Sequence, residues 1–287
     1  MTQASTLEQM MRKAGGDMAP GGAPGVFSIT SGKGGVGKTN ITTNLAYCMA
    51  RRGKRTMVID ADLNLANIDI LLGLAPKYNI QHVLNGEKNL AQVLVRGPGG
   101  FLILPASSGI LSLASLDESQ KLFLLSEMEE MAHDLDFLLI DTAAGINDNV
   151  LYFNLAAQER LVVLTPEPTS LTDAYALIKV LSANHGIDRF RVLVNMAESK
   201  AEGLGVYRKL AMTAERFLGS VSLDYAGFVP RDRKISEAVR QQKLLTELYP
   251  DTRAARAIDE LAGHLIDEYD NNGSGKENFF WRGMLNL

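Results

Sequence analysis

Residues 31–39, with the sequence SGKGGVGKT, constrain the fold of this chain more than any other segment. The apolar run Val26–Thr30 precedes them and a helical pattern over Thr39–Arg52 follows, so a glycine-rich loop joins a predicted strand to a predicted helix. The positions that match the phosphate-binding pattern G-x-x-x-x-G-K-[ST] are Gly32, Gly37, Lys38 and Thr39. A simple glycine-rich turn is the alternative interpretation, but the flanking strand and helix favour a phosphate site.

The chemistry of phosphate binding accounts for each residue type in this loop. Glycines let successive backbone N–H groups point at the phosphates, and the N-terminus of the following helix adds the positive end of its dipole. Lys38 is expected to neutralise the β- and γ-phosphates, and the Thr39 hydroxyl is expected to bind Mg²⁺. The other loop residues predicted to line the nucleotide are Lys33, Gly34, Gly35 and Val36.

Short apolar runs alternate with helical patterns from Val26 to about Tyr269. The predicted strands are Val26–Thr30, Arg55–Asp60, Phe101–Pro105, Phe137–Asp141, Leu161–Thr165, Arg191–Asn195 and Tyr225–Val229. The predicted helices are Thr39–Arg52, Ser119–His133, Asn149–Gln158, Ser170–His185 and Tyr207–Leu218. Nearly continuous apolar strands separated by helices indicate a sheet covered on both faces. We therefore expect one α/β domain over residues 26–270, a doubly wound, mostly parallel sheet with helices on both sides.

Charge and cysteine content limit the partners that the chain can have. With 29 basic and 33 acidic side chains and a formal charge of -4, the chain lacks the broad positive field that non-specific nucleic-acid binding needs. No direct nucleic-acid partner is therefore expected. The single cysteine, Cys48, excludes an internal disulfide, and neither a cleavable leader nor a membrane-spanning apolar run is evident, so we expect a cytoplasmic protein.

Lys33 narrows the class of phosphate site. With a second lysine inside the loop, the sequence KGGVGKT resembles the deviant phosphate loop of the family that contains the division-site ATPase MinD, the plasmid partition ATPases, nitrogenase iron protein and the iron–sulfur scaffold ATPases. The resemblance implies ATP/ADP and Mg²⁺ as cofactors and slow ATP hydrolysis stimulated by partners. It also implies an ATP-dependent homodimer in which Lys33 reaches the partner's phosphates and stabilises charge on the transferring phosphoryl group. Taken alone, Lys33 has a solvated loop residue as its alternative interpretation.

Carboxylates at two predicted strand ends match further parts of that family's pattern. Residues 60–69, DADLNLANID, are similar to its first switch, which implies that Asp62 orients the attacking water and that Asp60 helps to hold hydrated Mg²⁺. Residues 138–145, LLIDTAAG, supply Asp141 for the magnesium shell and Gly145, whose backbone N–H would approach the γ-phosphate. Ordinary capping and turn chemistry is the alternative for the acidic cluster.

The ends of the last two predicted strands supply candidates for base recognition. The amide of Asn195 can donate and accept at once, which suits the edge of adenine. Residues 228–232, FVPRD, resemble the family segment that lines the purine, which adds Pro230 and Asp232, with a turn role as the alternative. All these positions fall at carboxyl ends of strands, where open parallel sheets bind ligands.

Missing residues exclude the iron–sulfur branches of the family and argue against the partition ATPases, although the fold could still gather basic residues into a patch. One cysteine cannot hold a four-iron cluster, and no obvious basic run would build the DNA-binding patch of a partition ATPase. Residues 165–179, TPEPTSLTDAYALIK, resemble the flagellar-number regulators of the FlhG and FleN group. That resemblance implies, as partners, a FlhF-type signal-recognition GTPase, flagellar C-ring proteins and, in some bacteria, the master transcriptional activator of flagellar genes. A division-site positioning ATPase and a nucleotide-gated scaffold with negligible turnover are the alternatives.

The N-terminal residues are predicted to act on the GTPase partner. Residues 2–8, TQASTLE, are similar to the activating element of the flagellar group, although Thr2 and Glu8 replace its aspartate and arginine. The matching positions are Gln3, Ala4 and Leu7. We place this element in residues 1–13 and a glycine- and proline-rich linker in residues 14–25.

The C-terminal residues are predicted to contact the membrane. A linker over residues 271–276 precedes an amphipathic helix over residues 277–287. Its apolar residues are Phe279, Phe280, Trp281, Met284, Leu285 and Leu287. Two weak anchors on one dimer would act together on anionic lipid, so we expect the ATP form to be peripheral on the inner face of the cell membrane. The alternative is that this segment folds back into a groove of the domain.

Overall fold

The computed structural model describes residues 24–62, 67–105, 123, 126–128, 130–131, 134–219 and 221–271. Several predicted segments lie outside these residues: the N-terminal element, most of both linkers, the C-terminal helix, part of the first switch and most of the helix predicted over Ser119–His133. The candidate residues concerned are Gln3, Ala4, Leu7, Phe279, Phe280, Trp281, Met284, Leu285 and Leu287. Their assignments stay predictions.

The centre of the molecule is an eight-stranded sheet, which confirms the predicted fold class. Its strands are β1 (Gly25–Ser31), β2 (Thr56–Ala61), β3 (Val95–Arg96), β4 (Leu102–Leu104), β5 (Phe137–Ala144), β6 (Glu159–Leu164), β7 (Arg189–Ala197) and β8 (Ser222–Pro230). The strand order is β3-β4-β2-β5-β1-β6-β7-β8, and every neighbouring pair is parallel except β3 with β4. The strand that leads into the glycine-rich loop therefore lies between β5 and β6, near the middle of the sheet.

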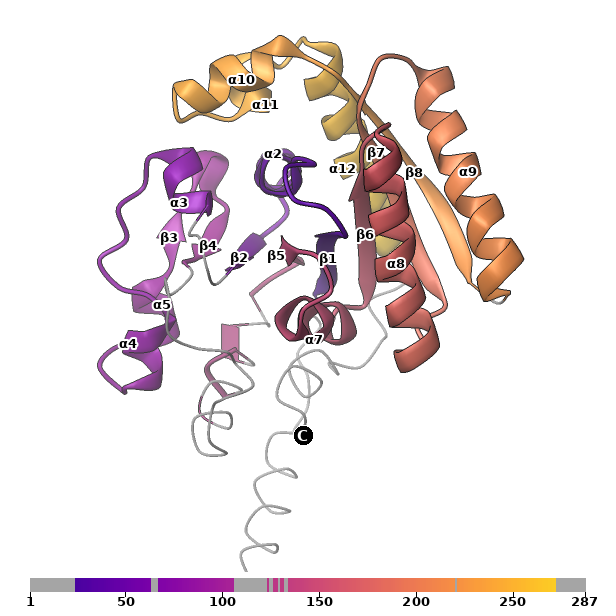
Figure 1. Ribbon diagram of the computed structural model, residues 1–287. Coiled ribbons are helices and arrows are strands. Elements are labelled where there is room, and N and C mark those ends of the chain that lie inside the picture. The colour runs from indigo at the N-terminus through magenta and orange to yellow at the C-terminus, as the bar shows by residue number, and fades with distance from the viewer. Residues whose placement is uncertain are drawn as a thin grey trace, which may run out of the picture.

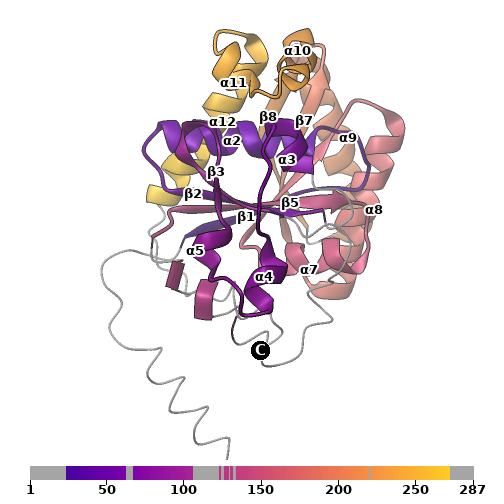
Figure 2. The same ribbon diagram turned by 90° about the vertical axis from the view of Figure 1, so that its left-hand side faces the viewer.

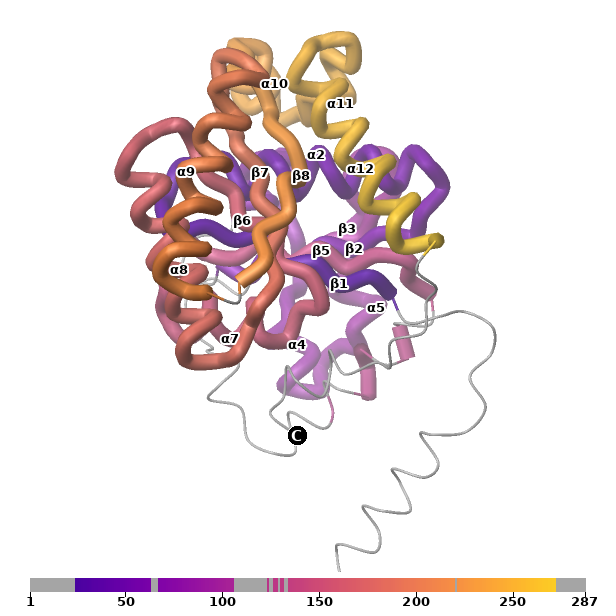
Figure 3. Tube along the Cα trace, turned by 90° about the vertical axis from the view of Figure 1, so that its right-hand side faces the viewer, coloured from indigo at the N-terminus to yellow at the C-terminus, as the bar shows by residue number. Residues whose placement is uncertain are grey.

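Helices cover both faces of the sheet (Figures 1 and 2). They are α2 (Lys38–Arg51), α3 (Asn67–Leu72), α4 (Ile80–Leu84), α5 (Leu90–Val93), α7 (Asp148–Ala156), α8 (Pro168–His185), α9 (Lys200–Leu218), α10 (Arg233–Arg240), α11 (Leu245–Leu248) and α12 (Arg253–Asn271), with a short 3-10 turn at Pro98–Gly100. The helices α2 and α12 pack together on one face, whereas α4, α5 and α7 lie on the opposite face (Figure 2). The pair α8 and α9 covers β6, β7 and β8 (Figure 3).

The central strands are buried on both faces, because alternate side chains point to opposite faces of the sheet and helices cover each face. In β1, Phe27 and Ile29 pack against α2 and α12, whereas Val26 belongs to the cluster on the opposite face. In β6, Val163 lies in the first layer and Val162 in the layer formed with α8 and α9. This two-sided burial is the reason that the strands read as continuous apolar runs.

The predicted strands all occur, and several elements were missed. The two-residue strand β3 is too short for a hydrophobic period to show, as are α5 and α11. The helix α9 begins at Lys200 rather than at Tyr207, because Ser199 caps its N-terminus by accepting a hydrogen bond from the Glu202 amide. The long helix α12, whose buried side chains line α2, was not predicted as a separate element. Among the described residues, no helix is both long and apolar enough to cross a membrane.

Candidate functional site

The predicted phosphate loop lies at the carboxyl end of β1 and leads directly into α2 (Figure 1). Gly35 and Gly37 have φ values of 77° and 93°, the left-handed region that glycine adopts without strain. Gly37 is the N-cap residue of α2 and offers no side chain, so the first-turn amides of the helix have no side-chain cap and no acidic neighbour in the first turn. An uncapped helix N-terminus behind a glycine loop fits an anion such as a phosphate.

Lys38 turns inward from the first position of α2. Its side chain is 8% exposed, and its Nζ donates to Ser31 Oγ at 2.8 Å. Ser31 Oγ in turn donates to the Lys33 carbonyl at 2.7 Å, so Ser31 links the two ends of the loop. Burial lowers the pKa of Lys38, and the nearby carboxylates of Asp141 and Asp62 oppose that shift. The amine therefore occupies a place where an anionic ligand would bind it more strongly than water does.

Hydroxyl and carboxylate oxygens gather directly beneath the loop. Thr39 Oγ1 donates to Asp141 Oδ2 at 2.6 Å, and Thr42 Oγ1 lies 3.2 Å from Asp141 Oδ1. Asp60 is the register partner of Asp141 on the neighbouring strand β2, and both carboxylates are buried. These are hard oxygen donors of the kind that Mg²⁺ prefers.

The two aspartates are held at an electrostatic cost in the absence of a cation. Burial, with a smaller contribution from Asp141, raises the pKa of Asp60 to about 7. Burial also raises the pKa of Asp141 to about 6, although its hydrogen bond from Thr39 and the charge of Lys38 act in the opposite direction. A divalent cation would stabilise the charged forms of both buried carboxylates, so the donor set fits Mg²⁺.

Protein side chains alone do not enclose a metal here. Within the described parts of the chain, no three His, Cys, Asp or Glu side chains come close enough together to hold a metal ion. A magnesium ion at Thr39, Asp60 and Asp141 would complete its shell with phosphate oxygens and water, which is its usual mode of binding beside a nucleotide.

Asp62 lies just beyond β2, where the attacking water was predicted. Its backbone N–H donates to Asp60 Oδ1 at 3.2 Å, and its Oδ2 accepts from Asn67 Nδ2 at 3.0 Å. The Ile68 amide donates to the other Asp60 oxygen at 3.2 Å. The start of α3 is thus connected to both aspartates, so a change in their charge would reach this helix.

Gly145 follows β5, with φ 96°, in a conformation that suits glycine. Its N–H donates to the Ser31 carbonyl at 3.0 Å. The amide predicted to contact the γ-phosphate is therefore next to the loop but is already paired with it, and it would have to leave Ser31 to bind a ligand.

The residues predicted to contact the base are divided between two environments. Asn195 is buried against the loop: its Nδ2 donates to the Val36 carbonyl at 2.8 Å and its Oδ1 accepts from the Met196 amide at 2.9 Å. Pro230 is the buried last residue of β8, whereas Asp232 caps α10 by accepting from the Lys234 amide at 2.9 Å. The structure brings Asn195 to the loop and makes Asp232 the N-cap of α10, and contact of Asn195, Pro230 and Asp232 with a base stays a prediction.

Lys33 has different hydrogen-bond partners from Lys38. Its Nζ lies 2.5 Å from Glu167 Oε2 and 2.8 Å from Thr169 Oγ1, both at the start of α8. The exposed fractions of the Lys33 and Glu167 side chains are 33% and 63%. Lys33 is therefore at the surface of the loop and bound to its own chain.

The family model that matches the chain is ParA, described as NUBPL iron-transfer P-loop NTPase, and the match covers residues 24–266. The chain belongs to the ParA family of P-loop NTPases. The description of that family mentions iron transfer, for which cysteine thiolates are common ligands. In this ParA-family chain the single cysteine, Cys48, is buried in α2.

Relatives and solved structures place this ParA-family chain among the flagellar regulators and the MinD-like proteins, which confirms the predicted resemblance. Antiactivator FleN of Pseudomonas aeruginosa is 48% identical over 237 residues, covering 83% of this chain and 84% of that protein. Flagellum site-determining protein YlxH of Helicobacter pylori is 34% identical over 261 residues, covering 89% and 88%. MinD in the MinC:MinD cell division protein complex of Aquifex aeolicus is similar in structure, with TM-score 0.68 and 28% identity over 85% of this chain and 96% of that chain.

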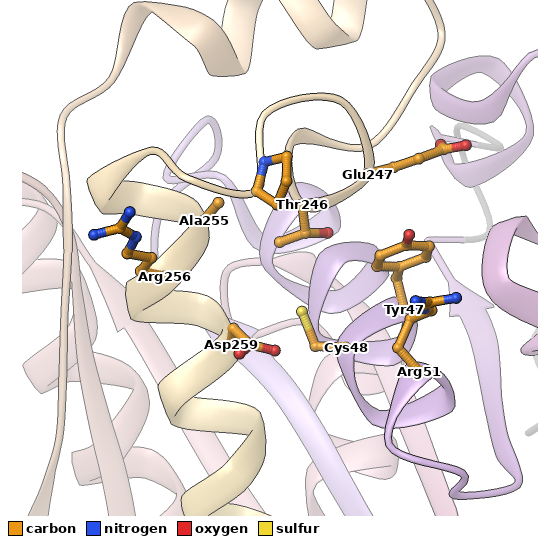
Figure 4. A pocket seen from close by; sticks show the side chains of 9 residues that line it. Tyr47, Cys48, Arg51, Thr246, Glu247, Ala255, Arg256 and Asp259 are labelled. Atoms are coloured by element: carbon orange, nitrogen blue, oxygen red, sulfur yellow. The ribbon is translucent and has the colours of Figure 1, made fainter.

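A small hollow lies on the flank of this ParA-family fold, away from the loop. It has a volume of about 300 Å³ and is lined by the end of α2, by α11 and by the start of α12 (Figure 4). Cys48 points into it toward Thr246, and burial raises the pKa of this thiol to about 12 (Figure 4). A protonated thiol is a poor nucleophile, so Cys48 is a packing residue rather than a reactive one.

Sequence reasoning missed the residues that hold the predicted ones in place. These are Ser31, Thr42, Asn67, Glu167 and Thr169. Thr42 carried a detectable signal, because it lies one helical turn after Lys38 and so faces the same side of α2. Glu167 and Thr169 lie in residues 165–179, which the sequence singled out by family resemblance, but no spacing or period connected them with Lys33, more than a hundred residues away.

Proposed function

We propose that the chain is an ATP-dependent, dimerising switch ATPase that regulates the number or placement of flagella. The observation that carries the proposal is the contact set beneath the loop, where Thr39 is hydrogen-bonded to buried Asp141 and Lys38 turns inward beside it. A fold alone would not argue for turnover, but hydroxyl, carboxylates and amine in this arrangement suit a Mg²⁺-bound triphosphate. The relatives named antiactivator FleN and flagellum site-determining protein YlxH support the flagellar role.

Each residue beneath the loop has a role in binding the nucleotide. Lys38 would exchange Ser31 Oγ for the β- and γ-phosphate oxygens, and the uncapped amides at the start of α2 would donate to the phosphates. Thr39 would exchange Asp141 for the metal, with Asp60 and Asp141 holding the metal's water ligands. Mg²⁺, when bound, supplies charge neutralisation on the β- and γ-phosphate oxygens.

Asp62 is the residue that we assign to orienting the attacking water. Its carboxylate follows β2 at the same edge of the sheet as the loop, and Asn67 holds one of its oxygens. The remaining oxygen can accept a proton from a water placed in line with the γ-phosphate. Release of phosphate would then change the charge beside Asp62 and so act on α3 through Asn67.

In the dimer, the two subunits would meet at the sheet edges that carry their nucleotide sites. Three large apolar side chains are exposed near the carboxyl ends of the strands: Ile70 in α3, Ile146 after β5 and Met196 in β7, with exposed fractions of 69%, 46% and 37%. Apolar groups beside a polar site are typical of a surface that is covered by a partner. Lys33 lies in the phosphate loop, between β1 and α2, and would reach the phosphates of the second subunit.

The partner assignments extend this proposal and depend on the family resemblance. They comprise a FlhF-type GTPase activated through residues 1–13, C-ring proteins, a flagellar transcriptional activator and an anionic membrane contacted by residues 277–287 in the ATP form. Sedimentation with anionic liposomes in ATP or ADP, with a chain lacking residues 277–287 as control, measures the membrane step. Binding that ignores the nucleotide would contradict it.

The decisive cellular experiment is the number of flagella per cell in a deletion strain. Altered flagellar number or placement with normal division supports the proposal. Minicells with normal flagella would instead support a division-site role, which the similarity to MinD structures keeps as the second candidate.

Substitution of Asp62 tests the hydrolytic mechanism. Asp62→Ala should lower phosphate release at least a hundredfold, because the general base is lost, while the ATP-bound dimer persists. Steady-state phosphate release and sedimentation of the dimer measure the two effects. The matched control is Asp251→Asn, at a carboxylate that is 95% exposed and forms its ion pair, within the described residues, with the exposed Arg256. Normal turnover in Asp62→Ala would sink this mechanism, and no turnover in the wild-type chain would favour a scaffold.

A further inference from the structure

The first end of α3 is bound to the two aspartates that follow one another at the end of β2. Asn67 Nδ2 donates to Asp62 Oδ2 at 3.0 Å, and the Ile68 amide donates to Asp60 Oδ2 at 3.2 Å. The helix has only six residues, which is too short for a helix to keep its own position in water. The orientation of the Asp62 carboxylate therefore depends on what holds the rest of α3.

The other end of α3 is bound by Gln242, which lies in the link between α10 and α11. In Figures 1 and 2 these two helices lie above α3. Gln242 Nε2 donates to the Ile70 carbonyl oxygen at 3.2 Å, across 172 positions of the chain. A Cβ at Gly73 would lie 2.8 Å from Gln242 Oε1, so the absence of a side chain at Gly73 makes room for this amide. Gln242 thus satisfies a carbonyl in the last turn of α3.

The backbone of Gln242 shows that a glutamine is unusual at this position. Its φ is 53°, in the left-handed region that favours glycine. Its N–H donates to the Val239 carbonyl at 3.0 Å, and the Lys243 N–H donates to the Ala238 carbonyl at 3.0 Å. This pair of bonds is the Schellman ending of a helix, in which glycine commonly takes the place of Gln242. The glutamine side chain strains the backbone here, and its contact with α3 is something that glycine could not supply.

The residues that follow Gln242 fix its backbone to the core. Leu244 and Leu245 are 1% and 2% exposed, and they belong to the same apolar cluster as Ile68 and Leu72 of α3. The link and the helix are therefore packed on one common layer. A donor with a fixed backbone can hold its acceptor in place.

We propose that Gln242 is a positioning residue for ATP hydrolysis. By holding the C-terminal end of α3, it keeps Asn67, and through Asn67 the carboxylate of Asp62, in the orientation that the attacking water needs. The inference rests on the proposed function, in which Asp62 orients that water. Because the phosphates are assigned to the loop and to α2, loss of Gln242 should lower kcat and leave the binding of ATP unchanged.

The variant Gln242→Gly tests this role without damaging the fold. Glycine suits the left-handed backbone but has no side chain to reach α3, so the free energy of unfolding should be no lower than that of the wild-type chain. We expect kcat to fall about 2- to 30-fold. The KM for ATP and the affinity for a fluorescent ATP analogue should stay within about twofold. Phosphate release is measured with Mg²⁺ at a protein concentration above which activity per chain no longer rises.

Two further variants separate the hydrogen bond from its surroundings. Gln242→Glu keeps the shape of the side chain but replaces the donor amide with a carboxylate, so it should lower kcat as Gln242→Gly does. Gln241→Ala is the matched control, because this neighbouring exposed amide contacts the Glu237 carbonyl and the Tyr249 hydroxyl rather than α3. Its kcat should equal that of the wild-type chain.

Hydrogen exchange of the nucleotide-free chain measures the same contact without turnover. Peptides that cover α3 should exchange about 2- to 10-fold faster in Gln242→Gly, whereas peptides from α9 should be unchanged. A normal kcat in Gln242→Gly, while the wild-type chain hydrolyses ATP, overturns the inference and leaves the proposed function standing. A lower kcat with unchanged exchange in α3, or with an equal loss of ATP affinity, also overturns it. A wild-type chain without hydrolysis overturns the proposed mechanism and this inference together.

Discussion

Lys38 and Lys33 belong to one loop but lie in opposite surroundings. Lys38 is buried, turns toward Ser31 and feels the charges of Asp141 and Asp62. Lys33 is partly exposed and bound by Glu167 and Thr169 of α8. The difference teaches that one glycine-rich loop can direct one amine into a buried, polar interior and leave the other at the surface, bound by a neighbouring helix.

The largest expected effect separates these two lysines directly. Lys38→Ala should weaken ATP binding at least a hundredfold, about 3 kcal/mol, because the phosphates lose a desolvated cation. Lys33→Ala should change the affinity of the monomer by no more than about threefold, because this amine is partly exposed and bound by Glu167 and Thr169. Titration of each variant with a fluorescent ATP analogue below the dimer concentration measures both, and equal losses would break the comparison.

The next prediction tests whether α8 fixes the backbone of the loop beside Lys33. Gly32→Ala should lower the free energy of unfolding by about 2 kcal/mol, because the new Cβ would meet the Asp173 backbone at 2.0 Å. Gly34→Ala is the matched control, since its nearest neighbour would lie at 3.9 Å. Denaturant unfolding of both variants without nucleotide measures the effect. Equal stability would show that α8 does not constrain the loop.

The smallest effect concerns the buried carboxylate of Asp60, in β2 beneath the loop. Because Asp60 has a pKa of about 7 in the folded chain and an ordinary one when unfolded, the folded state binds more protons between pH about 4 and 7. Its contribution therefore lowers stability as pH rises through this window, and the loss is complete above about pH 7. Asp60→Asn should stabilise the nucleotide-free chain by about 1 kcal/mol at pH 8 and flatten that pH dependence.

Unfolding midpoints at pH 5 and pH 8 measure this effect, with Asp251→Asn at the surface as control. A loss of stability at pH 8 in Asp60→Asn would mean that its hydrogen bonds from Asp62 and Ile68 outweigh the buried charge. Asp60 would then serve mainly to hold the backbone of Asp62 and Ile68 in place, rather than to bind a cation.

Much of the site could be predicted from the sequence because its residues lie in the loop or at the carboxyl ends of predicted strands. The loop, its following helix and the strand-end aspartates depend on spacing along the chain, and parallel strands bring their carboxyl ends to one edge. Asn195 was predicted near the nucleotide, and the structure places it against the loop, although both its polar groups are used by the protein. Its contact with adenine stays a prediction.

The sequence by itself determined the class of fold and the chemistry of the loop, because glycine, lysine and threonine at fixed spacing between a strand and a helix have few other uses. Only the tertiary structure decided where each amine goes. The partners of Lys33 come from α8, more than a hundred residues away, and no period or spacing connects positions that only the packing of α8 on the loop brings together.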